Sequence, residues 1–305
     1  MSKFAVPDGA YPILLTAFTE NDDLDLPAIG SLLDFYKVIG IPGVLALGQA
    51  SEVLLLNDDE RFRVAEYVAN HPTDDLTIAT VGNFGTTLED QAKSLQKIYD
   101  MGTDVVVVGV SLLPSPNNLG DQLVELTNLV GDEVQLGIYE LPEPEHRLLS
   151  PKEVAQVANT KRYFFMKDTC RQIVPFTAKV NAAKGSTLKL FQANLKVLPP
   201  SMEVGSHGFC GWMPIVAPEL CMQTVDMTNS VEVRQAAHDK LMEFNDVMVA
   251  HGFPSSAKHI LAKRGVSIQP YSRATAGQKF FEMGSVELDA YIEEQNPFVA
   301  VARMG

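Results

Sequence analysis

Cysteine and basic residues are scarce in this 305-residue sequence, and each shortage argues against a class of protein. Cysteine occurs only as Cys170, Cys210 and Cys221, without a CxxC pair, so the sequence predicts reduced thiols in a cytoplasmic protein and no disulfide framework. Lysine and arginine number 24 against 38 acidic residues. The resulting net charge of −14 argues against a partner that is nucleic acid or an anionic membrane surface.

Long apolar runs and nucleotide-binding motifs are absent from the sequence. No stretch reaches the ~18 apolar residues of a membrane span, and residues 1–12 lack the apolar segment of a signal peptide. Neither GxGxxG nor GxxxxGK[ST] occurs, so nucleotide binding has no support. What remains is a soluble globular protein, and its 46% hydrophobic residues suffice for a full core.

Short apolar runs alternate with segments of helical spacing over the first 218 residues. The runs predicted as strands are 11–16, 43–48, 76–81, 104–110, 134–140, 163–167, 187–192 and 207–212. Eight alternations of this size favour a (β/α)8 TIM barrel over an open, doubly wound sheet. Residues 219–305 are predicted to form a C-terminal helical extension, with helices at 219–251, 255–264 and 275–294.

The residue that stands out is Lys167, which ends the apolar run Phe164-Phe165-Met166. Active residues of a barrel gather at the C-terminal ends of its strands, where the sequence also places Tyr139. Burial favours a neutral amine, and a neutral amine can attack a ketone to form an imine. Spacing alone leaves open a lysine that simply reaches solvent, a structural role for Tyr139, and Lys189 as a rival in another apolar strand.

Three segments resemble the dihydrodipicolinate synthase and N-acetylneuraminate lyase family of class I Schiff-base aldolases. They are GVLALGQASEVLLLNDDER at 43–61, YELP at 139–142 and FFMKD at 164–168. The resemblance implies a (β/α)8 fold, an imine on Lys167 and a proton-shuttling Tyr139. It also implies substrate binding by the following residues: Gly48, Gln49, Ala50 and Ser51 in the carboxylate loop, Cys210 at a backbone-carbonyl position, and Arg147.

The sequence also departs from this family. Its members usually carry two hydroxyl residues in the carboxylate loop, where this chain has Gln49 and Ala50. At the position of the family's second glycine in that loop, this chain has Ser51. The segment at 109–116, GVSLLPSP, lacks the tyrosine of the synthase branch. These departures argue against a dihydrodipicolinate synthase proper.

The predicted function is therefore that of a lyase or aldolase that acts on pyruvate or a 2-keto(-3-deoxy) acid through a lysine imine. It needs no cofactor or metal, and the resemblance implies a homo-oligomer, either tetramer or dimer. Alternatives are a dehydratase using the same imine, the synthase itself, a metal-dependent aldolase and a non-catalytic keto-acid-binding protein. For the metal-dependent enzyme, only Glu52 and His207 could approach each other, and no HxH or HExxH spacing occurs.

Overall fold

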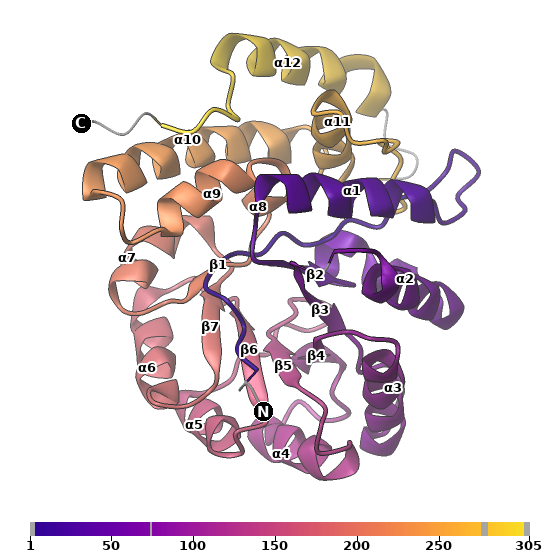
Figure 1. The fold of residues 1–305 in the computed structure, drawn as a ribbon, viewed down its shortest axis with the longest axis vertical. Coiled ribbons are helices and arrows are strands. Elements are labelled where there is room, and N and C mark those ends of the chain that lie inside the picture. The colour runs from indigo at the N-terminus through magenta and orange to yellow at the C-terminus, as the bar shows by residue number, and fades with distance from the viewer. Residues whose placement is uncertain (1–3, 74, 276–279, 302–305) are drawn as a thin grey trace.

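Eight parallel strands form the centre of the molecule, with helices around them (Figure 1). The computed structural model describes residues 4–73, 75–275 and 280–301. The strands are Gly9–Ala10 (β1), Gly43–Ala46 (β2), Thr77–Val81 (β3), Val105–Gly109 (β4), Leu136–Tyr139 (β5), Tyr163–Asp168 (β6), Lys189–Gln192 (β7) and Gly208–Phe209 (β8). Their order, β1-β8-β7-β6-β5-β4-β3-β2, follows the chain around the ring, which confirms the predicted TIM barrel.

The prediction for the first strand was wrong in position. Regular pairing with β8 covers only Gly9 and Ala10, not residues 11–16. Beyond this pairing, Pro12 faces β2, where its carbonyl accepts a hydrogen bond from Leu45 N but it has no backbone N–H to donate in return. A parallel bridge between Ile13 and Leu45 then joins this segment to β2, so the strands form a nearly closed ring.

Helices connect the strands and cover the outside of the barrel. The helices that alternate with the strands or follow the last of them are Leu26–Ile39 (α1), Asp58–Asn70 (α2), Leu88–Asp100 (α3), Leu119–Leu129 (α4), Pro151–Asn159 (α5), Ile173–Ala183 (α6), Leu198–Glu203 (α7) and Met213–Val216 (α8). Two of their starts follow from capping boxes, in which Asn57 pairs with Glu60 and Ser150 pairs with Glu153.

The predicted helix at 219–251 is two helices, Pro218–Val225 (α9) and Val231–Ala250 (α10). Asp226 accepts hydrogen bonds from the backbone and hydroxyl of Thr228, and Ser230 caps α10. Such short polar side chains compete with helical hydrogen bonds and favour a turn. The predicted helix at 275–294 corresponds to Phe280–Gln295 (α12), and the part at 276–279 lies outside the described residues.

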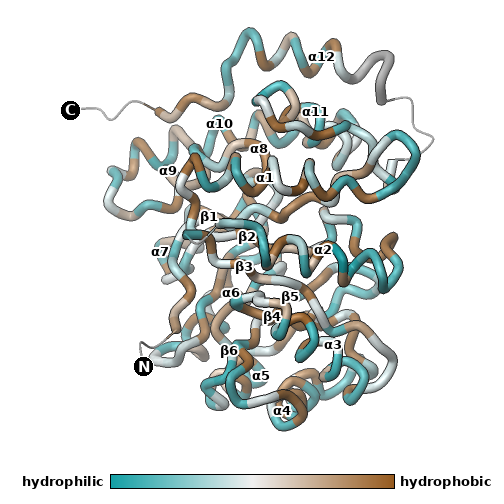
Figure 2. The backbone as a smooth tube through the Cα atoms, turned by 45° about the vertical axis from the view of Figure 1, so that its right-hand side comes forward, coloured by the Kyte–Doolittle hydropathy of each residue, from teal (hydrophilic) through white to brown (hydrophobic). Residues whose placement is uncertain are grey.

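Helices α9 to α12, including Ser255–Lys263 (α11), gather at one end of the molecule beside α1 (Figures 1 and 2). Figure 2 shows hydrophobic and hydrophilic residues alternating along the helices, as expected for helices with one buried face. The division of the chain after residue 218 stays a prediction. Within the described residues, no helix has the length and apolar character to cross a bilayer.

The core fills the barrel and the layer between strands and helices. The four valines at 105–108 of β4 are completely buried, as expected for a parallel strand covered on both faces. Lys167, Asp168 and Gln192 are buried polar residues at the ends of β6 and β7, where the candidate site lies.

Candidate active site

Lys167 and Tyr139 come from neighbouring strands, and the structure brings them together. They are paired in the register of β5 and β6, and Lys167 Nζ lies 4.3 Å from the centroid of the Tyr139 ring. Both line a cavity of about 280 Å³, although the lysine is only 2% exposed. An amine and a phenol therefore face the same small cavity at the C-terminal ends of the strands.

Burial determines the protonation of these groups. It lowers the pKa of Lys167 from 10.5 to about 8, because the charged amine loses its hydration. Burial also raises the pKa of Tyr139 above its usual value, so the phenol keeps its proton at neutral pH. The Cys210 thiol beside the amine has a pKa raised to about 11 by burial, and it is neutral as well. The site thus combines an amine that is partly neutral with a protonated phenol.

Two other lysines are as deeply buried as Lys167, but both have carboxylate partners. Lys179 lies 2.5 Å from Glu140 Oε1 and 2.7 Å from Asp168 Oδ2. Lys258 lies 2.9 Å from Glu52 Oε1. Among the described residues, no hydrogen bond or ion pair to an acid is found for Lys167 Nζ. Lys167 is therefore the buried lysine whose amine is available for chemistry.

The Lys179 cluster lies directly beside the reacting pair, since Glu140 follows Tyr139 and Asp168 follows Lys167. Although burial lowers it, the two carboxylates raise the pKa of Lys179 above its ordinary value. Burial, and then the charge of Asp168, raise the pKa of Glu140 to about 7. One amine from α6 thus ties the end of β5 to the end of β6 and fixes the spacing of the two site residues.

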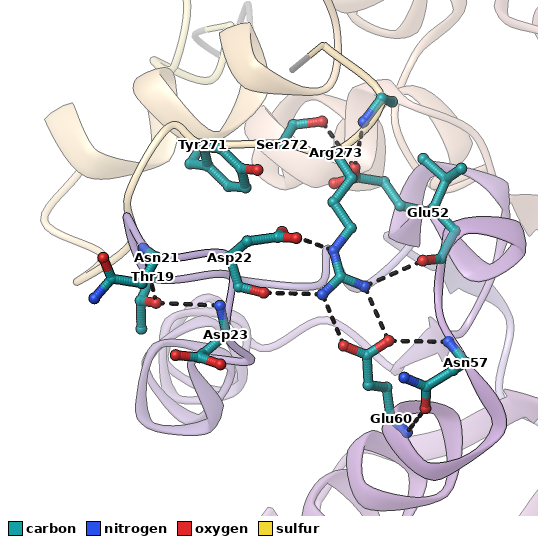
Figure 3. Close-up of polar contacts among 12 residues, drawn as sticks. Thr19, Asn21, Asp22, Asp23, Glu52, Asn57, Glu60, Tyr271, Ser272 and Arg273 are labelled. Atoms are coloured by element: carbon teal, nitrogen blue, oxygen red, sulfur yellow. Dashed lines mark hydrogen bonds and ion pairs between the residues drawn. The ribbon is translucent and has the colours of Figure 1, made fainter. Parts of the chain in front are cut away.

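The loop at 48–52 is held by residues of α11 and of the segment between α11 and α12. Glu52 accepts hydrogen bonds from Lys258, from the Ser272 hydroxyl and from the Ala274 backbone, at 2.8 to 2.9 Å. Next to it, Arg273 contacts Asp22 and Glu60 (Figure 3). These contacts connect the predicted carboxylate loop to residues more than 200 positions away.

The residues predicted to bind substrate have different locations. Gln49 lines the cavity with Lys167, and Gly48 lies beside the Tyr139 ring. Ala50 lines an adjoining pocket. The Ser51 hydroxyl is used structurally, because it donates to the Leu14 carbonyl at 2.6 Å and accepts from the Gly48 amide.

The structure does not bring Arg147 into the cavity. Its guanidinium donates to the carbonyls of Val110 and Leu113 and pairs with Glu145. Lys189, the rival lysine, is the first residue of β7 and pairs with Asp8 at 2.6 Å, so it lies at the other end of the strand.

Sequence reasoning missed several residues that line the cavity: Arg171, Asn194, Lys196, Trp212, Met242 and Asn245. Arg171 could have been suspected, since it follows Lys167 by four residues, beyond the end of the strand. Lys179 and Lys258 were missed too, and they carry a clear signal. Each occupies a buried position on a helix, where a lysine requires a partner.

A metal site in this cavity would need several His, Cys, Asp or Glu side chains close together. No group of three or more His, Cys, Asp or Glu residues gathers within the described parts of the chain. Glu52, one of the two ligands considered for a metal-dependent aldolase, is instead paired with Lys258. The ligands that this alternative needs are therefore not assembled among those residues.

An eight-stranded parallel barrel with a lysine at the end of its sixth strand and a tyrosine on the fifth has the architecture of a class I aldolase-type lyase. Comparison with known proteins agrees. The sequence profile of the Dihydrodipicolinate synthetase family matches residues 7–282, and the chain therefore belongs to this family.

Individual relatives are distant. The chain is 25% identical to YagE of Escherichia coli K12 over 190 residues, 61% of this chain and 62% of YagE, whose assignment as a 2-dehydro-3-deoxy-D-gluconate aldolase is itself provisional. It is 20% identical to a 4-hydroxy-tetrahydrodipicolinate synthase of Coxiella burnetii, over 85% of this chain and 89% of that protein. The crystal structure of YagE in complex with pyruvate superposes with a TM-score of 0.83, at 19% identity, covering 95% of this chain and 99% of YagE.

Proposed function

We propose that the chain is a Schiff-base lyase that acts on pyruvate or a larger 2-keto(-3-deoxy) acid through Lys167. One observation carries the proposal: Lys167 is the buried lysine without an acidic partner among the described residues, whereas Lys179 and Lys258 are paired. With a pKa of about 8, roughly a tenth of the Lys167 amine is neutral at pH 7. The pyruvate bound to YagE, a relative with the same fold, fits this substrate class.

The proposed reaction begins when Nζ adds to the keto carbon of the substrate. Water then leaves, a C=N bond forms, and the imine takes up a proton. In aldol cleavage, the C4 hydroxyl gives up its proton, the C3–C4 bond breaks and C4 leaves as an aldehyde. The electron pair of that bond enters an enamine, which is protonated at C3 and hydrolysed to free the shorter 2-keto acid and the lysine. In dehydration, C3 loses a proton and the C4 hydroxyl leaves as water.

Tyr139 is the group proposed to move protons in these steps. Its phenol is protonated at neutral pH, and it lies next to the amine, so it can donate a proton when water leaves and take one back later.

The 48–52 loop is proposed to hold the substrate carboxylate. Ser51 N donates within the loop, to Gly48 O, so the Ala50 amide and the Gln49 side chain are the groups proposed to bind it.

Trapping with borohydride tests the proposal. The protein is incubated with pyruvate and sodium borohydride, and its mass is then measured by mass spectrometry. We expect a covalent adduct that maps to Lys167. The variant Lys167→Ala should lose the adduct, whereas Lys189→Ala should keep it. If neither pyruvate nor any other 2-keto acid gives an adduct, the imine mechanism is wrong.

A second candidate is a keto-acid-binding protein without turnover. The Ser51 hydroxyl favours it, because that group is occupied by Leu14 and Gly48 and does not replace the family's usual proton relay. Such a protein would form the adduct but would not exchange the methyl protons of pyruvate. A metal-dependent aldolase would instead lose its activity in EDTA and form no adduct.

The same family membership supports a cytoplasmic homo-oligomer, a tetramer or a dimer. We propose this assembly for the present chain, and light scattering on the purified protein measures it. A monomer at micromolar concentration would contradict it.

A further inference from the structure

The cavity above Lys167 has an unusual charge. Its ionisable residues other than Tyr139 are Lys167, Arg171 and Lys196, and none of the described Asp and Glu residues lines it. Acidic residues outnumber basic ones by 38 to 24 in the whole chain. A cationic cavity in an acidic protein attracts anions, because low-dielectric walls strengthen the local field.

Arg171 and Lys196 also lack polar partners among the residues that the structure describes. Lys179 and Arg147, by contrast, are held by an acid and a carbonyl respectively. For the side chains of Arg171 and Lys196, no hydrogen bond or ion pair with a described residue exists. Each is exposed at the cavity and keeps its donors for a ligand.

The positions of the two cations follow from the barrel. Arg171 lies four residues after Lys167, beyond the end of β6, and Lys196 lies four residues after Gln192, the last residue of β7. Strands β6 and β7 are neighbours in the ring, so the two cations stand on adjacent loops at one side of the cavity. The 48–52 loop, which follows β2, approaches the cavity from a different side.

We propose that Arg171 and Lys196 form an anion subsite, and that the natural substrate is a 2-keto acid with a second anionic group at its far end. This inference rests on the proposed imine at Lys167. The first carboxylate lies at Gln49, on the side of the 48–52 loop, and the keto group lies at Lys167. The second anion, a carboxylate or a phosphate ester, is held by the guanidinium and the ammonium. The volume of about 280 Å³ suits such a small ligand.

Matched pairs of 2-keto acids test the subsite. Borohydride trapping on the whole protein is measured against the concentration of 2-oxoadipate and of 2-oxohexanoate, which has the same six carbons without the second carboxylate. A second pair, 2-keto-3-deoxygluconate with and without its 6-phosphate, tests the phosphate ester. We expect the anionic member of at least one pair to half-saturate at a concentration lower by about tenfold, since a charge-assisted hydrogen bond contributes roughly that factor. The pair with the larger ratio identifies the anion.

Variants connect that ratio to the two residues. In the double variant Arg171→Gln, Lys196→Gln the ratio should fall to within about twofold of one. Lys93→Gln, which changes an exposed lysine on α3, should leave it unchanged. A ratio near one in the unmodified protein, or a high ratio that survives in the double variant, would overturn the subsite.

Pyruvate tests the imine at Lys167 separately from the anion subsite. Pyruvate carries no distal group, so its adduct reports the Lys167 amine alone. Trapping with pyruvate but equal trapping of both members of each pair would reject the subsite and keep the imine. No adduct with pyruvate or any of the four acids would reject the imine itself.

Discussion

Lys179 Nζ lies 2.7 Å from Asp168 Oδ2, directly beside the lysine proposed to react. The same amine contacts Glu140, which follows Tyr139 in the chain. Because Lys179, Glu140 and Asp168 are almost completely buried, water cannot replace their contacts. The distance between Lys167 and Tyr139 therefore depends on Lys179 of α6, which binds the residue that follows each of them in the chain.

Lys179→Met should be strongly destabilising. The substitution preserves most of the volume but leaves two buried carboxylates without a cation, and breaking such a pair costs about 3–5 kcal/mol. Urea denaturation followed by circular dichroism measures the loss. Lys184→Met is the matched control, since Lys184 follows the same helix and is exposed. If the two variants are equally stable, the cluster does not hold the strands as described.

Glu140 makes stability depend on pH. Its folded pKa of about 7 is above the usual 4.5, so the folded chain binds more protons than the unfolded chain between these values. Its contribution to stability is therefore fully present below about pH 4.5 and is lost as the pH rises through 7. In Glu140→Gln, the fall in unfolding free energy between pH 5 and 8 should be smaller by about 1–3 kcal/mol. If the unfolding free energy of Glu140→Gln falls with pH as steeply as that of the unmodified protein, a group other than Glu140 titrates.

The sequence predicted the barrel because its signal is local and repeated. Buried parallel strands appear as apolar runs, and the four valines of β4 show this most clearly. Lys167 could be found because a lysine in such a run conflicts with its surroundings. Strand ends were less accessible, since pairing at β1 and β8 depends on backbone contacts with distant segments, such as that of Tyr11 N with Phe209 O.

The site was only partly predictable, because contacts between segments distant in the chain also position its residues. Arg147 was expected to bind substrate because of the family resemblance, but its guanidinium donates to the carbonyls of Val110 and Leu113 instead. The partner of Lys258 is Glu52, 206 residues away, and no local pattern indicates such a pair. What a single sequence does offer is the position of a lysine on the buried side of a helix.

Tyr139→Phe should separate adduct formation from proton transfer. The ring that packs on Lys167 remains, so the adduct with pyruvate should still form. Loss of the hydroxyl should slow deuterium exchange into the pyruvate methyl group by about 10²- to 10⁴-fold, the usual range for a lost acid–base group. Proton NMR in deuterium oxide measures this exchange. Tyr163→Phe removes a buried hydroxyl on β6 that donates to Leu123 O, and it should leave the exchange rate unchanged. Equal rates in both variants would remove Tyr139 from the mechanism.

Glu52 and Lys258 should behave as a coupled pair. Glu52→Gln leaves the Lys258 ammonium buried without a counterion, at a cost of about 3–5 kcal/mol. Adding Lys258→Met removes that charge, so the double variant should be more stable than the sum of the single changes by about 1–3 kcal/mol. Both single variants should also raise the half-saturating pyruvate concentration, because Glu52 holds the 48–52 loop. Additive effects in the double-mutant cycle would contradict the coupling. The exposed pair of Lys93 and Asp90 serves as the control, with little coupling expected.

Lys167 should affect reactivity and stability in opposite directions. Its folded pKa of about 8 is below the usual 10.5, so the rate of pyruvate trapping should rise about tenfold per pH unit below 8 and level off above it. The unfolded chain binds more protons between pH 8 and 10.5, which means that the buried amine costs stability below pH 8 and less as the pH rises further. Lys167→Met should therefore be more stable than the unmodified protein by about 3 kcal/mol at pH 7, with the gain shrinking toward pH 10.5. Paired urea titrations at pH 7 and 10 measure the difference, and a gain that is the same at both would mean that the amine is charged in the folded protein.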